Sequence, residues 1–199
     1  MNRAERSYYH QRAPEYDDWY LGAGQYAERV RPGWHAELGS LRATLAGLPA
    51  CRTLDVACGT GFLTRDLAGE VIALDQSAAM LRIARERLPG AGLVQGDAFS
   101  LPFRDASFAR LVAAHFYGHL EAPARARFWA ETRRVASSLL VVDAAWREDV
   151  QPEEWQPRIL RDGSRHTVYK RYFTPAQLAA EVGGGRILHS GRWFVAVLG

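Results

Sequence analysis

The stretch TLDVACGTGF, Thr53–Phe62, decides the fold of the chain. A short run of small and apolar residues leads into Gly59 and Gly61, which is typical of a strand that feeds a nucleotide-binding turn. Such a turn directs backbone N–H groups and a helix N-terminus toward a ligand. A dinucleotide site would have a third glycine, in the pattern G-x-G-x-x-G, where this chain has Thr64. The turn therefore disfavours a pyrophosphate ligand, but by itself it leaves the nucleotide open.

Two carboxylates follow the next two predicted strands. Asp75 ends the apolar run of residues 70–75, and Asp97 ends that of residues 91–98. A carboxylate at the tip of the second strand is placed to accept hydrogen bonds from a ribose diol. Asp97 is placed to accept from an adenine amino group. Aspartate is also common in turns and caps, but both residues at successive strand tips favour an adenosine ligand.

Strand-like and helix-like segments alternate along the chain, which predicts a parallel α/β sheet. The predicted helices after the glycine turn cover residues 62–68, 76–88, 121–136 and 174–185. The second begins at the cap Ser77, and the last begins with a Thr174–Gln177 capping box. Further strands are predicted over 108–116 and 138–145, and a closing antiparallel hairpin over 186–199. The fold class is α/β, with a Rossmann-like, doubly wound, seven-stranded sheet.

The whole chain, 1–199, is predicted to form one domain with four parts. Residues 1–48 form an N-terminal helical cap and residues 49–146 the nucleotide-binding core. Residues 147–173 are rich in Arg, Trp, Tyr and Pro, lack strong periodicity, and are interpreted as a variable lid or insert. Residues 174–199 form the closing helix and hairpin.

Composition narrows the class of protein further. The net charge is +3, the chain lacks a long basic run, and no apolar run approaches the ~20 residues that span a bilayer. The first ten residues lack the apolar core of a secretory signal. Cys51 and Cys58 are expected to be free thiols rather than part of a zinc site. We therefore expect a cytoplasmic monomer or homodimer without metal, nucleic-acid or membrane partners.

Five motifs, in order and with normal spacing, resemble the class I S-adenosylmethionine-dependent methyltransferases. The similar group is the small-molecule one related to ubiquinone/menaquinone biosynthesis. The motifs are YYHQRAPEYD (8–17), LDVACGTG (54–61), VIALDQSAAML (71–81), VQGDAFSLPF (94–103) and SFARLVAAHFYGHL (107–120). Ala109 stands where the family often has an acid, and RRVASSLLVVD (133–143) lacks the family's usual turn before the fifth strand.

The resemblance implies S-adenosyl-L-methionine as cofactor. It implies that the turn after the first strand holds the methionine part, that Asp75 holds the ribose, and that Asp97 with Ala98 reads the adenine edge. The cofactor-binding residues implied are Tyr16, Arg12, Asp55, Ala57, Gly59, Thr60, Gly61, Asp75, Gln76, Met80, Asp97, Ala98, Phe99 and His115.

The expected reaction is in-line methyl transfer to an O, N or C atom of a small molecule, in which the protein aligns the acceptor and excludes water. An O or N acceptor can also need a base, for which the candidates are His119, His115 and His166. Each of these histidines can equally be a satisfied structural residue. The substrate candidates are Tyr9, Trp19, Tyr117, His119, Trp146, His166 and Tyr169.

The segment WQPRILRDGSRHTVYKRYF (155–173) interleaves basic and aromatic residues, and we expect it to cover an acceptor with an acidic or aromatic group. A solvated loop edge is the alternative. Three other functions stay open: a cofactor-binding protein without methyl transfer or with another reaction such as a cyclisation, a protein or RNA methyltransferase, and a dinucleotide oxidoreductase. The sequence AHFYGH (114–119) lacks the base clamp of nucleic-acid base methyltransferases.

Overall fold

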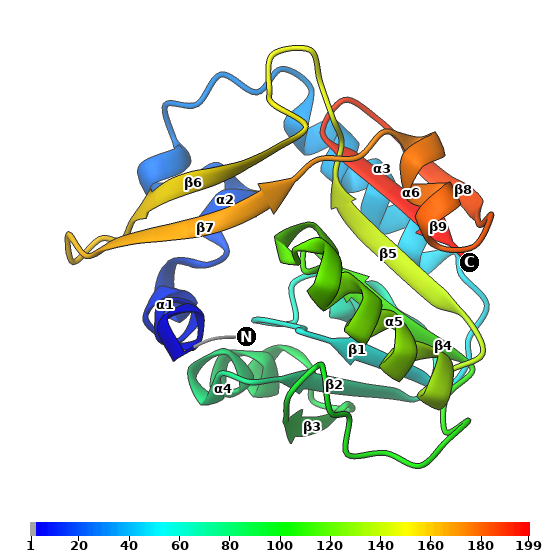
Figure 1. The fold of residues 1–199 in the computed structure, drawn as a ribbon. Helices are drawn as coiled ribbons and strands as arrows, with labels where there is room; N and C mark the ends of the chain where they lie inside the picture. The colour runs from blue at the N-terminus through cyan, green and yellow to red at the C-terminus, as the bar shows by residue number, and fades with distance from the viewer. Residues whose placement is uncertain (1–2) are drawn as a thin grey trace.

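The computed structural model describes residues 3–199, with side chains described from Ser7 onward. Its centre is a seven-stranded sheet (Figure 1). The spatial order is β3 (Gly92–Gln95), β2 (Val71–Asp75), β1 (Thr53–Val56), β4 (Arg110–Ala114), β5 (Leu139–Ala144), β9 (Phe194–Leu198) and β8 (Arg186–Ser190). The first five strands are parallel, and β9 pairs antiparallel with both β5 and β8. The predicted fold class and the closing hairpin are confirmed.

Alternate residues of the central strands face two layers of helices. On one side Leu111 and Val141 pack with α5 (Ala122–Val135) and α6 (Pro175–Glu181). On the other side Val112 and Leu140 pack against α3 (Trp34–Ala46). Figure 1 shows α5 and α6 in front of the sheet and α3 behind it. Burial on both faces explains why β5 is apolar along almost its whole length.

Caps predicted from sequence begin two of the helices. The Ser77 hydroxyl accepts from the backbone N–H of Met80 at the start of α4 (Ala78–Arg87). Thr174 and Gln177 form both hydrogen bonds of a capping box at the start of α6. These local contacts satisfy N–H groups that a helix start leaves without a partner.

The predicted helix over residues 62–68 is wrong. The segment makes only one 3-10 turn, η3 (Thr64–Asp66). The Thr64 hydroxyl donates to Asp55 at 2.5 Å, and Leu63 packs in the cluster that α3 covers. At the far end, Gly69 has φ +102°, and a Cβ there would lie 2.4 Å from the carbonyl oxygen of Cys51. Helix α3, from the N-terminal segment, thus covers the face that a longer helix would have needed.

The segment 147–173, which shows no strong periodicity, forms an antiparallel hairpin of β6 (Glu153–Ile159) and β7 (Arg165–Arg171). Figure 1 shows this hairpin leaving the main sheet and reaching toward the N-terminal helices. Its tip is tied there, because the backbone N–H of Arg161 donates to the buried Glu15 carboxylate at 3.2 Å. The Arg161 guanidinium also pairs with Asp18.

Ahead of α3, the described part of the N-terminal segment consists of short helices. They are α1 (Arg3–Arg12), η1 (Ala13–Glu15), α2 (Asp18–Leu21) and η2 (Gly24–Tyr26). Ala13 packs on Ala79 and Met80 of α4, so this segment borders the carboxyl end of the sheet. Within residues 3–199, none of the helices combines the length and apolar character that a membrane crossing requires.

Candidate active site

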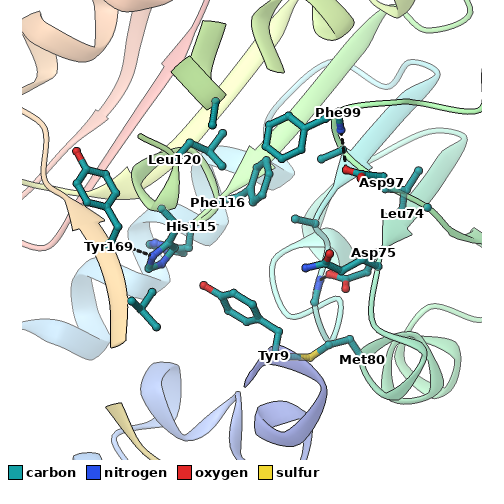
Figure 2. A pocket seen from close by; sticks show the side chains of 18 of the residues that line it. Tyr9, Leu74, Asp75, Met80, Asp97, Phe99, His115, Phe116, Leu120 and Tyr169 are labelled. Carbon is teal, nitrogen blue, oxygen red and sulfur yellow. Dashed lines mark hydrogen bonds between the residues drawn. The ribbon is translucent and has the colours of Figure 1, made fainter. Parts of the chain in front are cut away.

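A cavity of about 400 Å³ lies at the carboxyl ends of the parallel strands. Ala57 and Gly59 reach it from β1, Asp75 from β2, Asp97 from β3 and His115 from β4. Figure 2 shows Asp75, Met80, Asp97 and Phe99 on one side, with the Tyr9 ring projecting from α1 toward His115. Ligands of open α/β sheets bind at this edge, so the cavity has the position of a nucleotide site.

The backbone at this edge is strained at two non-glycine residues. Ala57, just after β1, has φ +57°, and His115, just after the neighbouring β4, has φ +52°. Gly59 and Gly61 adopt the same left-handed conformation without a Cβ penalty. Such strain costs about 1–3 kcal/mol per residue and clusters at ligand sites. The two strained residues, Ala57 and His115, follow neighbouring strands on one cavity wall, which indicates that the turns there bind a ligand.

Asp75 has its carboxylate bound to the two turns beside it. One oxygen accepts from the backbone N–H of Gly59 at 2.9 Å and the other from that of Ser77 at 2.8 Å. Burial raises the pKa of this carboxyl, while the backbone hydrogen bonds act in the opposite direction. Each oxygen can accept a further hydrogen bond. Asp75 is therefore positioned rigidly and keeps acceptor capacity toward the cavity.

The part of the cavity beyond Asp75 is suited to a flat, partly apolar ring. Leu74, Met80 and Phe99 supply apolar surface there. At its edge Asp97 accepts from the backbone N–H of Phe99 at 3.0 Å, and Ala98 lines the same wall. This combination of apolar faces and an edge carboxylate fits an adenine base.

The N-terminal segment closes the cavity over the glycine turn. A Cβ on Gly59 would lie 3.3 Å from Cε1 of Tyr16, so the ring sits directly against the turn. The neighbouring Asp17 accepts from the Thr60 hydroxyl and from Arg87, each at 2.5 Å. Thr60 therefore faces Asp17 rather than the cavity, and Asp17 holds Tyr16 over the turn.

A second cavity, of about 370 Å³, adjoins the first. Its walls come from the N-terminal segment and the hairpin β6–β7, including Arg12, Trp19 and Arg158. The two cavities share four lining residues: Tyr9, Tyr16, His115 and His119. Two molecules bound one in each cavity would therefore come together at these four side chains.

Two histidines at this junction, the buried His115 and the half-buried His119, are held in neutral forms. Nδ1 of His119 lies 2.7 Å from the carbonyl oxygen of Tyr169, which can only accept, so we assign the proton to Nδ1. Its Nε2 is then a free lone pair. Burial lowers the pKa of His119 well below its usual range, and burial lowers that of His115 to about 4. Nε2 of His115 is buried without a partner among the described residues.

Behind the histidines lies a buried ion pair. Nζ of Lys170, in β7, lies 2.5 Å from Oδ1 of Asp143, in β5. Asp143 also accepts from the backbone N–H of Gly118 at 2.7 Å, directly before His119. Burial opposes ionisation of Asp143, but Lys170 and the adjacent histidines hold its carboxyl pKa below the usual range. The pair joins the hairpin to the central sheet beneath the junction.

Most of the predicted cofactor residues line the first cavity: Tyr16, Ala57, Gly59, Asp75, Gln76, Met80, Asp97, Ala98, Phe99 and His115. Arg12 lines the second cavity instead. Asp55, Thr60 and Gly61 line neither, because Asp55 and Thr60 bond to Thr64 and Asp17, and a Cβ on Gly61 would face Leu88. These three residues shape the turn from behind.

Of the predicted substrate residues, Tyr9, Trp19, His119 and Tyr169 lie on cavity walls. The structure brings Tyr117, His166 and Trp146 to neither cavity. The Tyr117 hydroxyl bonds to Glu181 of α6, His166 contacts Ser164 and the Tyr8 ring, and Trp146 is exposed. His166 lies on the same face of β7 as Val168 and Lys170, which line the cavities, but it is nearer the tip of the hairpin. Its ring packs there against the ring of Tyr8, with 4.9 Å between the ring centres.

Sequence reasoning missed several residues of the second cavity, including Tyr26, Arg29, Arg31 and Trp193. The run RVRPGW (29–34) is a usable signal, because it sets basic and aromatic residues beside a turn. The run itself does not show that this segment lies against the C-terminal hairpins, so it could not be recognised from sequence as a cavity wall.

Residues 54–138 match the family of methyltransferase domains. This match covers less than half of the chain. The chain is 35% identical over 85 residues to demethylmenaquinone methyltransferase of Renibacterium salmoninarum, covering 41% of this chain and 36% of that protein. It is 38% identical over 111 residues to phthiotriol/phenolphthiotriol dimycocerosates methyltransferase of Mycobacterium tuberculosis, covering 51% and 39%. The chain thus spans less than two fifths of the length of these curated relatives.

A likeness over the full length comes from solved structures. The DhpI-SAM-HEP complex has a TM-score of 0.74 and 28% identity, covering 100% of this chain and 98% of that one. The DhpI-SAH complex has a TM-score of 0.71 at 28% identity, covering 98% and 94%. The chain therefore has the fold of the class I S-adenosylmethionine-dependent methyltransferases, and the resemblance seen in the five motifs is confirmed.

Proposed function

We propose that the protein transfers the methyl group of S-adenosylmethionine to a small-molecule acceptor. The observation that carries this proposal is the junction of two cavities at Tyr9, Tyr16, His115 and His119. One cavity fits an adenosine-type ligand, and the other opens on the same four side chains. The fold and the SAM and SAH complexes of its structural neighbours support this cofactor.

The residues present fit the cofactor. Asp75 would accept from the ribose hydroxyls, and Asp97 with Ala98 would contact the adenine edge between Met80 and Phe99. The strained turns at Ala57 and His115 would present backbone groups to the methionine part. Tyr16 would close that end from above, because its ring already lies against Gly59.

Methyl transfer requires the protein mainly to align the acceptor with the methyl group and to exclude water. When bound, S-adenosylmethionine supplies a methyl group activated by the sulfonium charge. The aromatic rings of Tyr9, Tyr16 and Trp19 exclude water from the junction and orient the acceptor. For an O–H or N–H acceptor, the free Nε2 of His119 would take the proton, since its Nδ1 is already bonded to Tyr169.

The class of acceptor is supported by the relatives. Their names specify demethylmenaquinone and phthiotriol derivatives, which are small molecules rather than nucleic acid or protein. The expected absence of a nucleic-acid partner, the cytoplasmic location and the oligomeric state stay predictions.

Titration calorimetry with S-adenosylmethionine, S-adenosylhomocysteine and NAD tests the cofactor. We expect the first two to bind and NAD not to bind; binding of NAD alone would overturn the proposal. A screen of S-adenosylhomocysteine release against candidate acceptors then tests transfer. Tight cofactor binding with no release for any acceptor would favour the alternative, a binding protein or a different reaction on the same fold.

A further inference from the structure

The wall of the second cavity is strongly positive. Six of its lining residues are cationic, and no Asp or Glu is among its described lining residues. Two of the cations have carboxylate partners: Lys170 pairs with Asp143 at 2.5 Å and Arg147 with Asp149 at 3.0 Å. The other four have no ion pair with any described carboxylate: Arg12, Arg29, Arg31 and Arg158.

Arg12 is the most informative of the four because it is 8% exposed. Its Nη atoms donate to the hydroxyls of Tyr8 at 2.7 Å and Tyr26 at 3.2 Å, and its Nε is buried without a partner. Both partners are phenols, and burial raises the pKa of Tyr8, so that partner stays neutral. A buried guanidinium without a counter-charge is costly, which indicates that an anion completes the site.

Two further arginines reach the same cavity from separate elements. Arg31 donates from Nη1 to the carbonyl of Trp19 at 2.8 Å, and its guanidinium lies 3.8 Å from the centre of the Trp34 ring. Arg158, in β6, donates to Gln156 and Pro157 of its own strand. Both are half-buried and keep N–H groups beyond these bonds, since a guanidinium has five.

We propose that the second cavity binds the acceptor through a dianionic oxyanion group, such as a phosphoryl group, with Arg12, Arg31 and Arg158 as its ligands. The proposal rests on the proposed function in taking this cavity as the acceptor site. Guanidinium forks match tetrahedral oxyanions through paired hydrogen bonds. Several unpaired guanidiniums around one cavity provide more positive charge than a single carboxylate neutralises.

The cofactor's own carboxylate is the competing occupant for Arg12, since the resemblance places that residue near the methionine part. Arg31 and Arg158 separate the two readings, because they line the second cavity and not the first. The test therefore uses Arg31→Gln and Arg158→Gln. Arg133→Gln serves as the matched control, since Arg133 is exposed on α5, against Trp129, and lines neither cavity.

The experiment titrates inorganic phosphate, and separately acetate, into the protein at constant low ionic strength, with calorimetric detection. We expect saturable phosphate binding that weakens at least tenfold in each cavity variant and stays unchanged in the control. Acetate should bind at least tenfold more weakly than phosphate. Absence of saturable phosphate binding, equal affinity in the cavity variants, or acetate binding as tightly as phosphate would overturn the proposal.

S-adenosylmethionine is titrated into the same four proteins. Its affinity should stay within threefold of the native value in the cavity variants, which also shows that they are folded. A loss of phosphate binding without a loss of cofactor binding locates the oxyanion in the second cavity. Phosphate binding in a protein that fails to bind the cofactor would contradict the proposed function and leave the anion site standing.

Discussion

Nδ1 of His119 lies 2.7 Å from the backbone carbonyl oxygen of Tyr169, so a residue of the hairpin sets the tautomer of a histidine that follows β4. The contact joins segments 50 residues apart in sequence. It leaves Nε2 unprotonated at the junction of the two cavities. The position of the hairpin and the chemistry of the histidine are therefore linked.

If His119 accepts a proton from the acceptor, His119→Ala should lower kcat by about 10²- to 10⁴-fold while cofactor affinity changes little. His35→Ala is the control, because His35 is exposed on α3 and lines neither cavity. The pKa of His119 is well below its usual value, so kcat/KM should stay flat as pH falls from 8 to 6.5. A midpoint near 6.5 that vanishes in the variant would contradict the assigned protonation state.

Asp75→Ala should weaken binding of S-adenosylmethionine by one to two orders of magnitude. The reason is the loss of charge-assisted hydrogen bonds to the ribose, worth about 1.5–3 kcal/mol. Glu70→Ala is a suitable control, because Glu70 is exposed and pairs only with Arg52 among the described residues. Calorimetry measures both, and an Asp75 variant with native affinity would refute the ribose role.

Gly59→Ala should destabilise the protein by about 1–2 kcal/mol, because the residue has φ +57° and its Cβ would press on Tyr16 at 3.3 Å. Gly39→Ala provides the opposite case, since Gly39 lies inside α3 with open space around its Cβ position. That change should stabilise by about 0.5–1 kcal/mol. Urea unfolding of both variants measures the difference, and a neutral Gly59→Ala would remove the argument for a tight Tyr16 contact.

Asp55 should make the protein less stable as pH rises. Burial raises its carboxyl pKa from 3.8 to about 7, against the opposing hydrogen bond from Thr64. A folded-state pKa above the unfolded value means that ionisation costs more in the folded state. The contribution of Asp55 to the free energy of unfolding is fully present below pH 3.8 and is lost as pH rises to about 7, by roughly 4 kcal/mol in all.

Asp55→Asn removes this titration, so the native protein should lose about that amount relative to the variant between pH 4 and 7.5. The comparison cancels His115, whose lowered pKa acts with the opposite sign. Free energies of unfolding at several pH values give the result. A difference that does not change with pH would show that Asp55 ionises normally.

Local signals made much of the fold predictable. Ser77, Thr174 and Gln177 act through neighbours within a few residues, so their caps can be read directly from sequence. The proximity of Asp75 and Asp97 could also be predicted from sequence, because parallel strands bring their carboxyl ends to one edge of the sheet. The cofactor half of the site follows from such rules.

The acceptor half depends on contacts that no local pattern contains. The tip of the hairpin is fixed by Glu15 and Arg161, which are 146 residues apart. The helix expected over 62–68 is missing because α3, a distant segment, packs on the same face. Where a segment's partners lie at the other end of the chain, periodicity and caps do not reveal its structure.

The two cavities that meet at Tyr9 and Tyr16 draw their characteristic charged residues from different parts of the chain. The matched domain, residues 54–138, contributes Asp75 and Asp97 to one cavity, whereas the arginines of the other come from outside that domain. If the proposed function holds, mutations in the outer segments can therefore change the acceptor that is bound while the cofactor site of the matched domain is kept. Related chains with the same core should differ most in the charge and shape of these two outer walls.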